Sequence, residues 1–304
     1  MDAAVETGQA PLFLLGAPRS GTTLLYKALC LHPDAVYVSN WLRRFPRLTS
    51  LAALNRLAGR FPETRRTVWF GADSNAYVYG ARRLWRHRLF PMPVEGEPLF
   101  ARCGVVQDGV SPISEDAQRA ALRQAFSAIR RSGGGGHVIS KRIANNRRIS
   151  LLAGAFPGAR FVHIIRDGRA VALSLSRVDW WRESVVSWYG GTPARWEAEG
   201  RDPWDLCALE WVENLHAVED GLRAVPSHRV TTLRYEDVVG APLDALAQIA
   251  AFAGLAARPS WMGELERVRF HDRNRTWADQ LSPAALSRIE ALQHDDLLRH
   301  GYLS

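Results

Sequence analysis

Short apolar runs alternate along the chain with longer amphipathic stretches. The apolar runs predict buried strands at residues 11–15, 35–39, 137–141, 160–165 and 229–233. Apolar residues at helical spacing predict helices at residues 22–31, 114–131, 149–156, 169–176, 205–225, 243–252, 261–268 and 282–299. Strands that alternate with helices are typical of an α/β domain, with a mostly parallel central sheet and helices on both faces. We expect residues 1–304 to form one such domain.

Two aromatic-rich segments interrupt this pattern. Residues 40–110 are irregular and rich in aromatics and arginine, with a proline-rich piece at 90–98. Long irregular segments in compact domains are usually functional or disordered, and this one is too aromatic for disorder. It predicts a substrate-facing insertion at about 40–110, with a packed helical excursion as the alternative. The tryptophans of residues 178–211 are expected either to stack on sugar or aryl groups or to fill a core.

Charge and composition narrow the class of ligand. Lys and Arg total 39 against 31 Asp and Glu, and the formal net charge of +8 favours an anionic ligand. Since no block of basic residues is interleaved with aromatics, we expect no nucleic-acid partner. Cys30, Cys103 and Cys207 lie far apart, which argues against a disulfide framework or zinc site and fits a reducing compartment.

The sequence predicts neither an export signal nor a membrane span. The N-terminus has no basic n-region, and no uncharged apolar run approaches the roughly 18 residues of a membrane span. We therefore expect a soluble, cytoplasmic protein without a transmembrane segment.

The sequence PLFLLGAPRSGTTLL, at residues 11–25, carries the clearest chemical signal. An apolar run enters a glycine-containing turn and then a helical pattern, the layout of a phosphate-binding loop in which backbone N–H groups face an anion. Gly16 and Gly21 have the spacing G-x-x-x-x-G, but Thr22 stands where a nucleotide triphosphatase carries lysine. Arg19 supplies a positive charge three residues earlier. The loop predicts a phosphate site that does not handle a γ-phosphate in the usual way.

A second anion signal follows a later strand. Arg166 ends the apolar run at 160–165, and Ser174 lies eight residues further on, in the next helix. Ligands of parallel sheets collect at the carboxyl ends of strands, and Asp167 is a possible N-cap for that helix. Taken alone, the motif could be a surface turn with a solvated arginine. Paired with the first loop, it indicates a ligand with phosphates at two places.

These two motifs resemble those of the sulfotransferases that use 3′-phosphoadenosine 5′-phosphosulfate (PAPS), especially the bacterial, carbohydrate-type branch of the P-loop sulfotransferases. GAPRSGTTLL at 16–25 is similar to the family's 5′-phosphosulfate loop, and FVHIIRDGRAVALSLS at 161–176 to its 3′-phosphate motif. LRYED at 233–237 resembles the strand that brings a tyrosine to the adenine, and the patterns at 277–281 and 297–302 resemble the family's C-terminal end. The resemblance implies direct in-line transfer of a sulfuryl group from PAPS to a hydroxyl or, as a lesser alternative, an amine.

The resemblance also implies which residues hold the donor. The residues matched to the 5′-phosphate loop are Arg19, Ser20, Gly21, Thr22 and Thr23. Those matched to the 3′-phosphate and adenine sites are Arg166, Ser174 and Tyr235, with Asn274 and Arg275 in a late loop that reaches the 3′-phosphate. The resemblance thus implies PAPS as co-substrate. Because sulfuryl transfer from PAPS involves no γ-phosphate, we expect no requirement for a metal.

Lys141 is the candidate for stabilising charge on the leaving oxygen. By analogy with phosphoryl transfer, catalysis requires a cation aimed at that oxygen. Lys141 lies in ISKRIANN, which resembles the family's lysine-bearing strand end E-K-x-P, although Ser140 and Ile143 replace the glutamate and proline. Lysine supplies a compact point charge with three donors. A surface lysine is the alternative.

The base that accepts the acceptor's proton is less clearly marked. Relatives place a glutamate shortly after the second strand, where this chain has Asn40, and an amide cannot take a proton. The other candidates are Glu95, Glu97, Asp73 and His32. We favour Glu95, because the sequence around it resembles a stretch in some bacterial relatives.

Two other functions stay open at the level of the sequence. A small-molecule kinase could use the same scaffold, but would need a triphosphate-binding lysine and magnesium-holding carboxylates. A catalytically silent nucleotide-binding protein is possible because the early glutamate is missing. The acceptor is expected to be a small-molecule, carbohydrate or lipid-linked compound, and the sequence does not indicate an oligomeric state.

Overall fold

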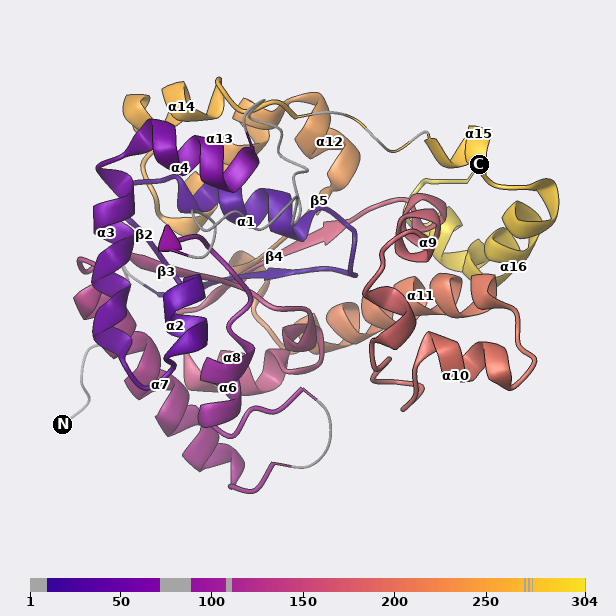
Figure 1. The fold of residues 1–304 in the computed structure, drawn as a ribbon, viewed down its shortest axis with the longest axis horizontal. Helices are drawn as coiled ribbons and strands as arrows, with labels where there is room; N and C mark the ends of the chain where they lie inside the picture. The colour runs from indigo at the N-terminus through magenta and orange to yellow at the C-terminus, as the bar shows by residue number, and fades with distance from the viewer. Residues whose placement is uncertain are drawn as a thin grey trace.

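A parallel sheet lies at the centre of the molecule (Figure 1). The computed structural model describes residues 10–71, 89–107, 111–270, 272, 274 and 276–303. Over these residues the strands are β1 (Leu12–Leu15), β2 (Ala35–Tyr37), β3 (His137–Lys141), β4 (Arg160–Ile165) and β5 (Val230–Arg234). They lie in the order β2-β3-β1-β4-β5, and every neighbouring pair is parallel. The predicted α/β class is confirmed.

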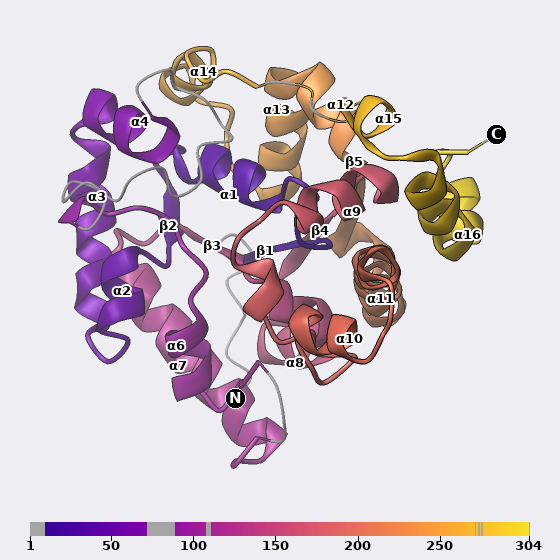
Figure 2. The same cartoon turned by 45° about the vertical axis from the view of Figure 1, so that its right-hand side comes forward.

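Side chains that alternate along β1 build the core on both faces of the sheet. Leu12 and Leu14 pack with α1 (Thr22–Cys30), α13 (Pro242–Ala253) and α14 (Pro259–Leu265), whereas Phe13 and Leu15 pack toward α7 (Glu115–Ser132) and α8 (Ile149–Ala155). Figure 2 shows these two groups of helices on opposite sides of the strands. Because β1 is buried on both faces, it reads in the sequence as a continuous apolar run.

A third layer of helices stands beyond the end of the sheet. Helices α9 (Gly168–Ser176), α11 (Pro203–Leu222) and α16 (Pro283–Arg299) pack together around Trp211, and α10 (Pro193–Ala198) joins them. The carboxyl ends of β1 and β4 point toward α9 (Figure 1). The remaining elements are α2 (Asn40–Arg44), α3 (Ala53–Gly59), α4 (Pro62–Phe70), α6 (Glu97–Arg102), α12 (Tyr235–Gly240), α15 (Thr276–Gln280) and 3₁₀ turns at Thr49–Ala52, Ile143–Arg147, Trp181–Glu183 and Ser227–Arg229.

Many aromatic side chains in the two irregular segments fill the core. Trp69 is fully buried, meets Tyr37 edge to face and donates from Nε1 to the carbonyl of Pro91 at 2.9 Å. Trp181 and Trp196 are buried with α9 and α11, while Trp180 stays half exposed. In the described part of residues 40–110, Trp69, Phe70 and Phe100 are buried and Phe90 packs against the core, whereas Phe45 and Phe61 are exposed. The piece that reaches the carboxyl edge of the sheet is the stretch before α6, which carries Glu95.

Candidate functional site

The loop between β1 and α1 has an unusual backbone. Gly16 has φ +146°, and a Cβ there would lie 2.5 Å from the carbonyl oxygen of Ile164 in the neighbouring strand. Arg19, at φ 70°, is the one non-glycine residue with a positive φ among those the structure describes. Left-handed backbone at a non-glycine residue is costly and clusters at ligand sites. The loop is therefore held in a shape that packing alone would not favour.

The N-terminus of α1 is arranged to receive an anion. Gly21 occupies the N-cap position, and no side chain caps the helix within the described residues. The first N–H groups of an α-helix lack intrahelical partners, and they attract negative charge. Ser20 is 1% exposed, and its Oγ has no hydrogen-bond partner in the structure. A phosphate oxygen would supply the missing partner, so these residues fit the predicted 5′-phosphate.

Arg166 and Ser174 converge on the same loop. The Arg166 Nη1 donates to the backbone oxygen of Arg19 at 2.9 Å, and its Nε donates to Asn274 Oδ1 at 3.1 Å. Ser174 Oγ accepts a hydrogen bond from Arg19 Nε at 2.9 Å. The two predicted anion motifs are therefore in direct contact, because β1 and β4 are neighbours.

The sequence RDGR is not a surface turn. Asp167 accepts the Arg169 N–H at 2.9 Å, which confirms it as the N-cap of α9. Both arginines are only 7% exposed. Arg169 is held by Asp167, by Glu290 and by the backbone oxygen of Tyr302, so Arg166 is the arginine of this motif that faces the loop.

Tyr235 supports the loop from beneath. It is the first residue of α12, is 1% exposed and lies under the Arg166 guanidinium, 4.4 Å from ring centroid to Cζ. A Cβ at Gly21 would come within 2.5 Å of its Cδ2. The predicted contact of Tyr235 with an adenine stays a prediction, and Arg275 lies outside the described residues.

Lys141 and Glu95 meet at the carboxyl end of β3. Lys141 is the last residue of that strand, pairs in register with Leu14 and is 5% exposed, so it is not a surface lysine. It forms an ion pair with Glu95, whose other oxygen accepts the N–H of Ile143 at 3.2 Å. Burial opposes ionisation of Glu95, but the Lys141 charge and these hydrogen bonds outweigh it and lower the pKa of the carboxyl. The structure brings both catalytic candidates together.

The other base candidates have structural partners or lie elsewhere. Glu97 pairs with Arg142, at 2.7 Å from its Oε1 to Nη2. His32 follows the far end of α1, where Nε2 meets the carbonyl of Ala256 at 2.7 Å and Nδ1 accepts the Asp34 N–H. Asp73 lies outside the described residues. These contacts leave Glu95 as the described candidate beside Lys141.

Asn40 positions the segment that carries Glu95. Its Nδ2 donates to the carbonyl of Phe90, and its Oδ1 accepts the N–H of Met92, both at 3.1 Å. The backbone N–H of Asn40 also donates to the carbonyl of Met92 at 3.1 Å. The amide cannot act as a base, but it clamps the stretch that leads into Glu95.

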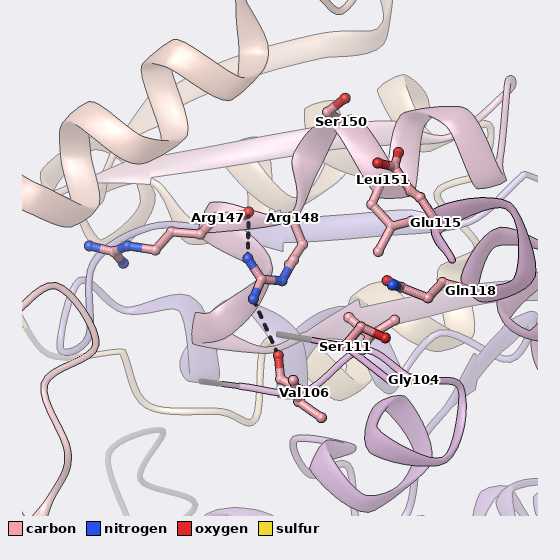
Figure 3. A pocket seen from close by; sticks show the side chains of 10 residues that line it. Gly104, Val106, Ser111, Glu115, Gln118, Arg147, Arg148, Ser150 and Leu151 are labelled. Atoms are coloured by element: carbon pink, nitrogen blue, oxygen red, sulfur yellow. Dashed lines mark hydrogen bonds between the residues drawn. The ribbon is translucent and has the colours of Figure 1, made fainter. Parts of the chain in front are cut away.

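A cavity of about 230 Å³ opens beside Glu95 and Pro18. Its far wall includes Trp180, Trp181 and the buried Glu210, whose pKa burial raises to about 6. A second cavity, of about 300 Å³, lies between the start of α7 and that of α8 (Figure 3). There Arg148 donates to the backbone oxygens of Val106 and Arg147, and none of the predicted donor or catalytic residues lines it.

Comparison with known proteins decides the family. The model of the sulfotransferase family matches residues 11–259. The chain belongs to the sulfotransferase family. The predicted family and fold are thereby confirmed, and sulfuryl transfer is the chemistry that the family supports.

This sulfotransferase is similar to two curated relatives, the omega-hydroxy-beta-dihydromenaquinone-9 sulfotransferases Stf3 of Mycobacterium bovis and Mycobacterium tuberculosis. Each is 23% identical over 317 residues, which cover 96% of this chain and 75% of the relative. Among solved structures, sulfotransferase STF9 from Mycobacterium avium has a TM-score of 0.58 at 16% identity, over 95% of this chain and 76% of that one. STF1 from Mycobacterium tuberculosis H37Rv has a TM-score of 0.54 at 15% identity, over 94% and 76%. These structures share the fold of the sulfotransferase described here.

Neither a metal cluster nor a membrane-spanning helix occurs in the part of the chain that the structure describes. No group of three or more His, Cys, Asp and Glu side chains is arranged to hold a metal ion there. Over the same residues, no helix has both the length and the apolar character needed to cross a bilayer.

Proposed function

We propose that this sulfotransferase transfers a sulfuryl group from PAPS to an acceptor hydroxyl by direct in-line attack. The proposal is supported by the hydrogen bond from Arg19 to Ser174, which joins the two predicted anion motifs, and by the Lys141–Glu95 pair. PAPS bears phosphates on two carbons of one ribose, which suits two adjoining sites. A cation and a carboxylate at the same edge of the sheet suit the transfer itself.

The proposed donor contacts follow from burial and hydrogen-bonding capacity. The α1 N–H groups, with Ser20, Thr22 and Thr23, would hold the 5′-phosphate, and Ser20 Oγ has a vacant hydrogen-bonding capacity for it. Arg166 and Ser174 would hold the 3′-phosphate, with Arg19 between the two groups. Tyr235 and Arg275 complete the proposed donor site.

Lys141 and Glu95 would divide the chemistry between them. Glu95 takes the proton of the acceptor hydroxyl as its oxygen forms the new bond to sulfur. Lys141 stabilises the negative charge that collects on the phosphate oxygen when the sulfur–oxygen bond of the donor breaks. A lysine has three N–H donors, so Lys141 can keep Glu95 and still point another donor at that oxygen. The step balances without a metal or a covalent enzyme intermediate.

The cavity beside Glu95 is the proposed entrance for the acceptor. Its volume of about 230 Å³ is below the roughly 300–1,000 Å³ of sites for drug-sized ligands, so it would take one end of a larger acceptor or a small one. The half-exposed Trp180 offers an apolar surface at its wall. The names of the Stf3 relatives specify a hydroxylated menaquinone, which supports a lipid-linked alcohol as one acceptor class beside small molecules and carbohydrates.

We expect the reaction to take place in the cytoplasm. Cys30, Cys103 and Cys207 are free, buried thiols, as expected in a reducing compartment.

Calorimetry with the desulfo product, 3′-phosphoadenosine 5′-phosphate (PAP), tests the donor half. We expect PAP to bind in the presence of a chelator. Binding of ATP only with magnesium would overturn the proposal in favour of a kinase. A broad panel of hydroxyl and amine acceptors, incubated with labelled PAPS, then tests transfer, and donor binding without any transfer would indicate a catalytically silent protein.

A further inference from the structure

Gly16 is held on both sides of its backbone by one side chain. Its N–H donates to Asn146 Oδ1 at 3.2 Å, and its carbonyl accepts from Asn146 Nδ2 at 2.9 Å. Gly16 is the residue at which β1 becomes the phosphate loop, and Asn146 is 1% exposed. The direction in which the chain leaves the strand therefore depends on this amide.

The Asn146 amide is itself held by a chain of buried partners. Its Nδ2 donates to Asn214 Oδ1 at 2.9 Å, and the Asn214 Nδ2 donates to Glu210 Oε1 at 2.8 Å. The other oxygen of Glu210 accepts the indole N–H of Trp188 at 2.7 Å. Asn214 is fully buried and Glu210 is 8% exposed.

The carboxylate of Glu210 and its backbone carbonyl, which both accept from Asn214 Nδ2 at 2.8 Å, together fix the direction of the bonds in this chain. An ionised carboxylate only accepts hydrogen bonds, whereas an amide has one accepting and one donating end. Glu210 therefore obliges Asn214 to turn its Nδ2 toward it, and the Asn214 Oδ1 then obliges Asn146 to present its Nδ2. A reversed Asn146 amide would set its donor against the Gly16 N–H. Buried networks of this kind are favourable only when every member is satisfied.

We propose that Glu210, Asn214 and Asn146 form a positioning relay that fixes Gly16, and through it the donor-binding loop. Glu210 and Asn214 also line the cavity beside Glu95, so the relay joins the wall of the acceptor cavity to the donor site. Arg147 adds a second donor to Asn214 Oδ1 at 3.3 Å. Donor affinity should thus depend on a carboxylate that belongs to the other half of the active site. The expected effect on donor affinity rests on the proposed function, but the hydrogen bonds that hold Gly16 do not depend on it.

The test uses the whole protein and two substitutions in the relay. Glu210→Gln keeps the size of the side chain but replaces one accepting oxygen with an N–H₂ group. That group would face a second donor, either Trp188 Nε1 or Asn214 Nδ2, so one hydrogen bond of the relay is lost. Asn146→Asp keeps the oxygen that accepts from Gly16 and removes both donated bonds. The matched control is Glu213→Gln, which removes one negative charge from the same helix and leaves in place the backbone oxygen of residue 213 that accepts from Arg147.

Two measurements test the relay and the proposed function independently of each other. Hydrogen exchange of the Gly16 amide, normalised to the slowest-exchanging amides of the sheet, reports the hold on the loop without any ligand. Calorimetry reports the affinity for PAP. Both relay variants should speed the exchange at Gly16 and weaken PAP binding roughly three- to tenfold, the effect of one or more lost hydrogen bonds, whereas Glu213→Gln changes neither.

Each outcome decides between the two proposals. Unchanged Gly16 exchange in Glu210→Gln, or an effect equal to that of Glu213→Gln, overturns the relay. Faster exchange with unchanged PAP affinity also overturns it, because the loop then binds its donor without this support. A third outcome is that the wild type binds no PAP while both relay variants exchange faster at Gly16. That result supports the role of the relay in holding Gly16 and overturns the proposed donor instead.

Discussion

Arg19 Nε lies 2.9 Å from Ser174 Oγ and donates a hydrogen bond to it, although 155 residues separate the two in sequence. Arg19 follows β1 and Ser174 lies on the helix after β4, and these strands are hydrogen-bonded neighbours. The carboxyl ends of parallel neighbours share one edge of a sheet, where ligands collect. Two motifs that the sequence separates are therefore in direct contact, as the proposed donor site requires.

Removal of Arg166 should weaken donor binding. The side chain is buried, donates to the loop carbonyl of Arg19 and to Asn274, and lies over Tyr235. Hydrogen bonds to charged groups contribute about 1.5–3 kcal/mol, so Arg166→Ala should raise the Kd for PAP about 10- to 100-fold in calorimetry.

Arg177→Ala is the matched control for Arg166→Ala. Arg166 lies just before α9, and Arg177 lies just after it. The Arg177 side chain is exposed and contacts Gln280. Arg177→Ala also removes one positive charge next to α9, but it breaks no contact with the loop at Arg19, so it should leave the Kd for PAP nearly unchanged. Equal affinity of the wild type and Arg166→Ala would show that the 3′-phosphate site lies elsewhere.

Lys141→Ala should reduce turnover while PAP binding is largely kept. The ammonium is buried against Glu95 at the end of β3, and we propose that it meets charge that develops only as the donor bond breaks. Loss of one such donor costs about 10²–10³ in kcat. The measurement is kcat with PAPS and an active acceptor, alongside the Kd for PAP.

Glu95→Gln provides the comparison for Lys141→Ala, because it disrupts the same ion pair from the other side. A lost general base typically costs 10²–10⁴-fold in rate. If Lys141→Ala weakened PAP binding by as large a factor as it lowered kcat, Lys141 would be a binding residue without a specific role in the transition state.

Much of this site could be predicted because its signals are local. The apolar runs predict β1, β3 and β4 within a residue or two, since these strands are buried on both faces and each contains consecutive apolar residues. The phosphate loop and Arg166 follow directly after such strands, so their place at the carboxyl edge follows from the strands themselves.

The contacts that assemble the site could not be predicted from the sequence. Lys141 and Glu95 were both candidates, but the sequence does not show that they pair, nor that Asn40 holds the stretch before Glu95 by contacts 50–52 residues away. Asn146 and Asn214 belong to no motif, because an asparagine in a helix or turn is unremarkable until its partner across the fold is known. The aromatics of residues 40–110 suggested a substrate surface, whereas Trp69 and Phe70 are core residues.

Gly21→Ala should destabilise the protein more than Gly135→Ala. Both glycines have a left-handed backbone, at φ +87° and +84°, but an added Cβ at Gly21 meets Tyr235 at 2.5 Å and one at Gly135 meets nothing within 4 Å. Gly135→Ala therefore measures the backbone cost, about 1–2 kcal/mol. Gly21→Ala adds a packing conflict of about 1–3 kcal/mol, measured by urea unfolding.

The double variant Gly21→Ala/Tyr235→Ala shows whether the ring is the cause. Removal of the ring leaves room for the new Cβ, so the cost of Gly21→Ala should fall toward that of Gly135→Ala in the Tyr235→Ala background. An undiminished cost in that background would contradict the packing of Tyr235 against the loop.

His163 should make the folded state less stable as the pH falls. It lies in β4 at 2% exposed, and burial, with a smaller effect from His300, lowers its pKa to about 3. Above pH 6.5 the imidazole is neutral in both states. Below that value the unfolded chain binds a proton that the folded protein excludes, so stability falls by about 1.4 kcal/mol per pH unit until the pH nears the folded pKa.

His163→Leu isolates this contribution, because every other titrating group remains in both proteins. Stability measured by urea unfolding from pH 8 to pH 4 should decline less steeply in the variant, by up to about 1.4 kcal/mol per pH unit below pH 6. The difference at pH 8 reports packing alone, since the histidine is neutral there. Parallel stability curves for the two proteins would show that His163 has the same pKa in the folded and unfolded states, which would require water to reach it in β4, the strand that Arg166 follows.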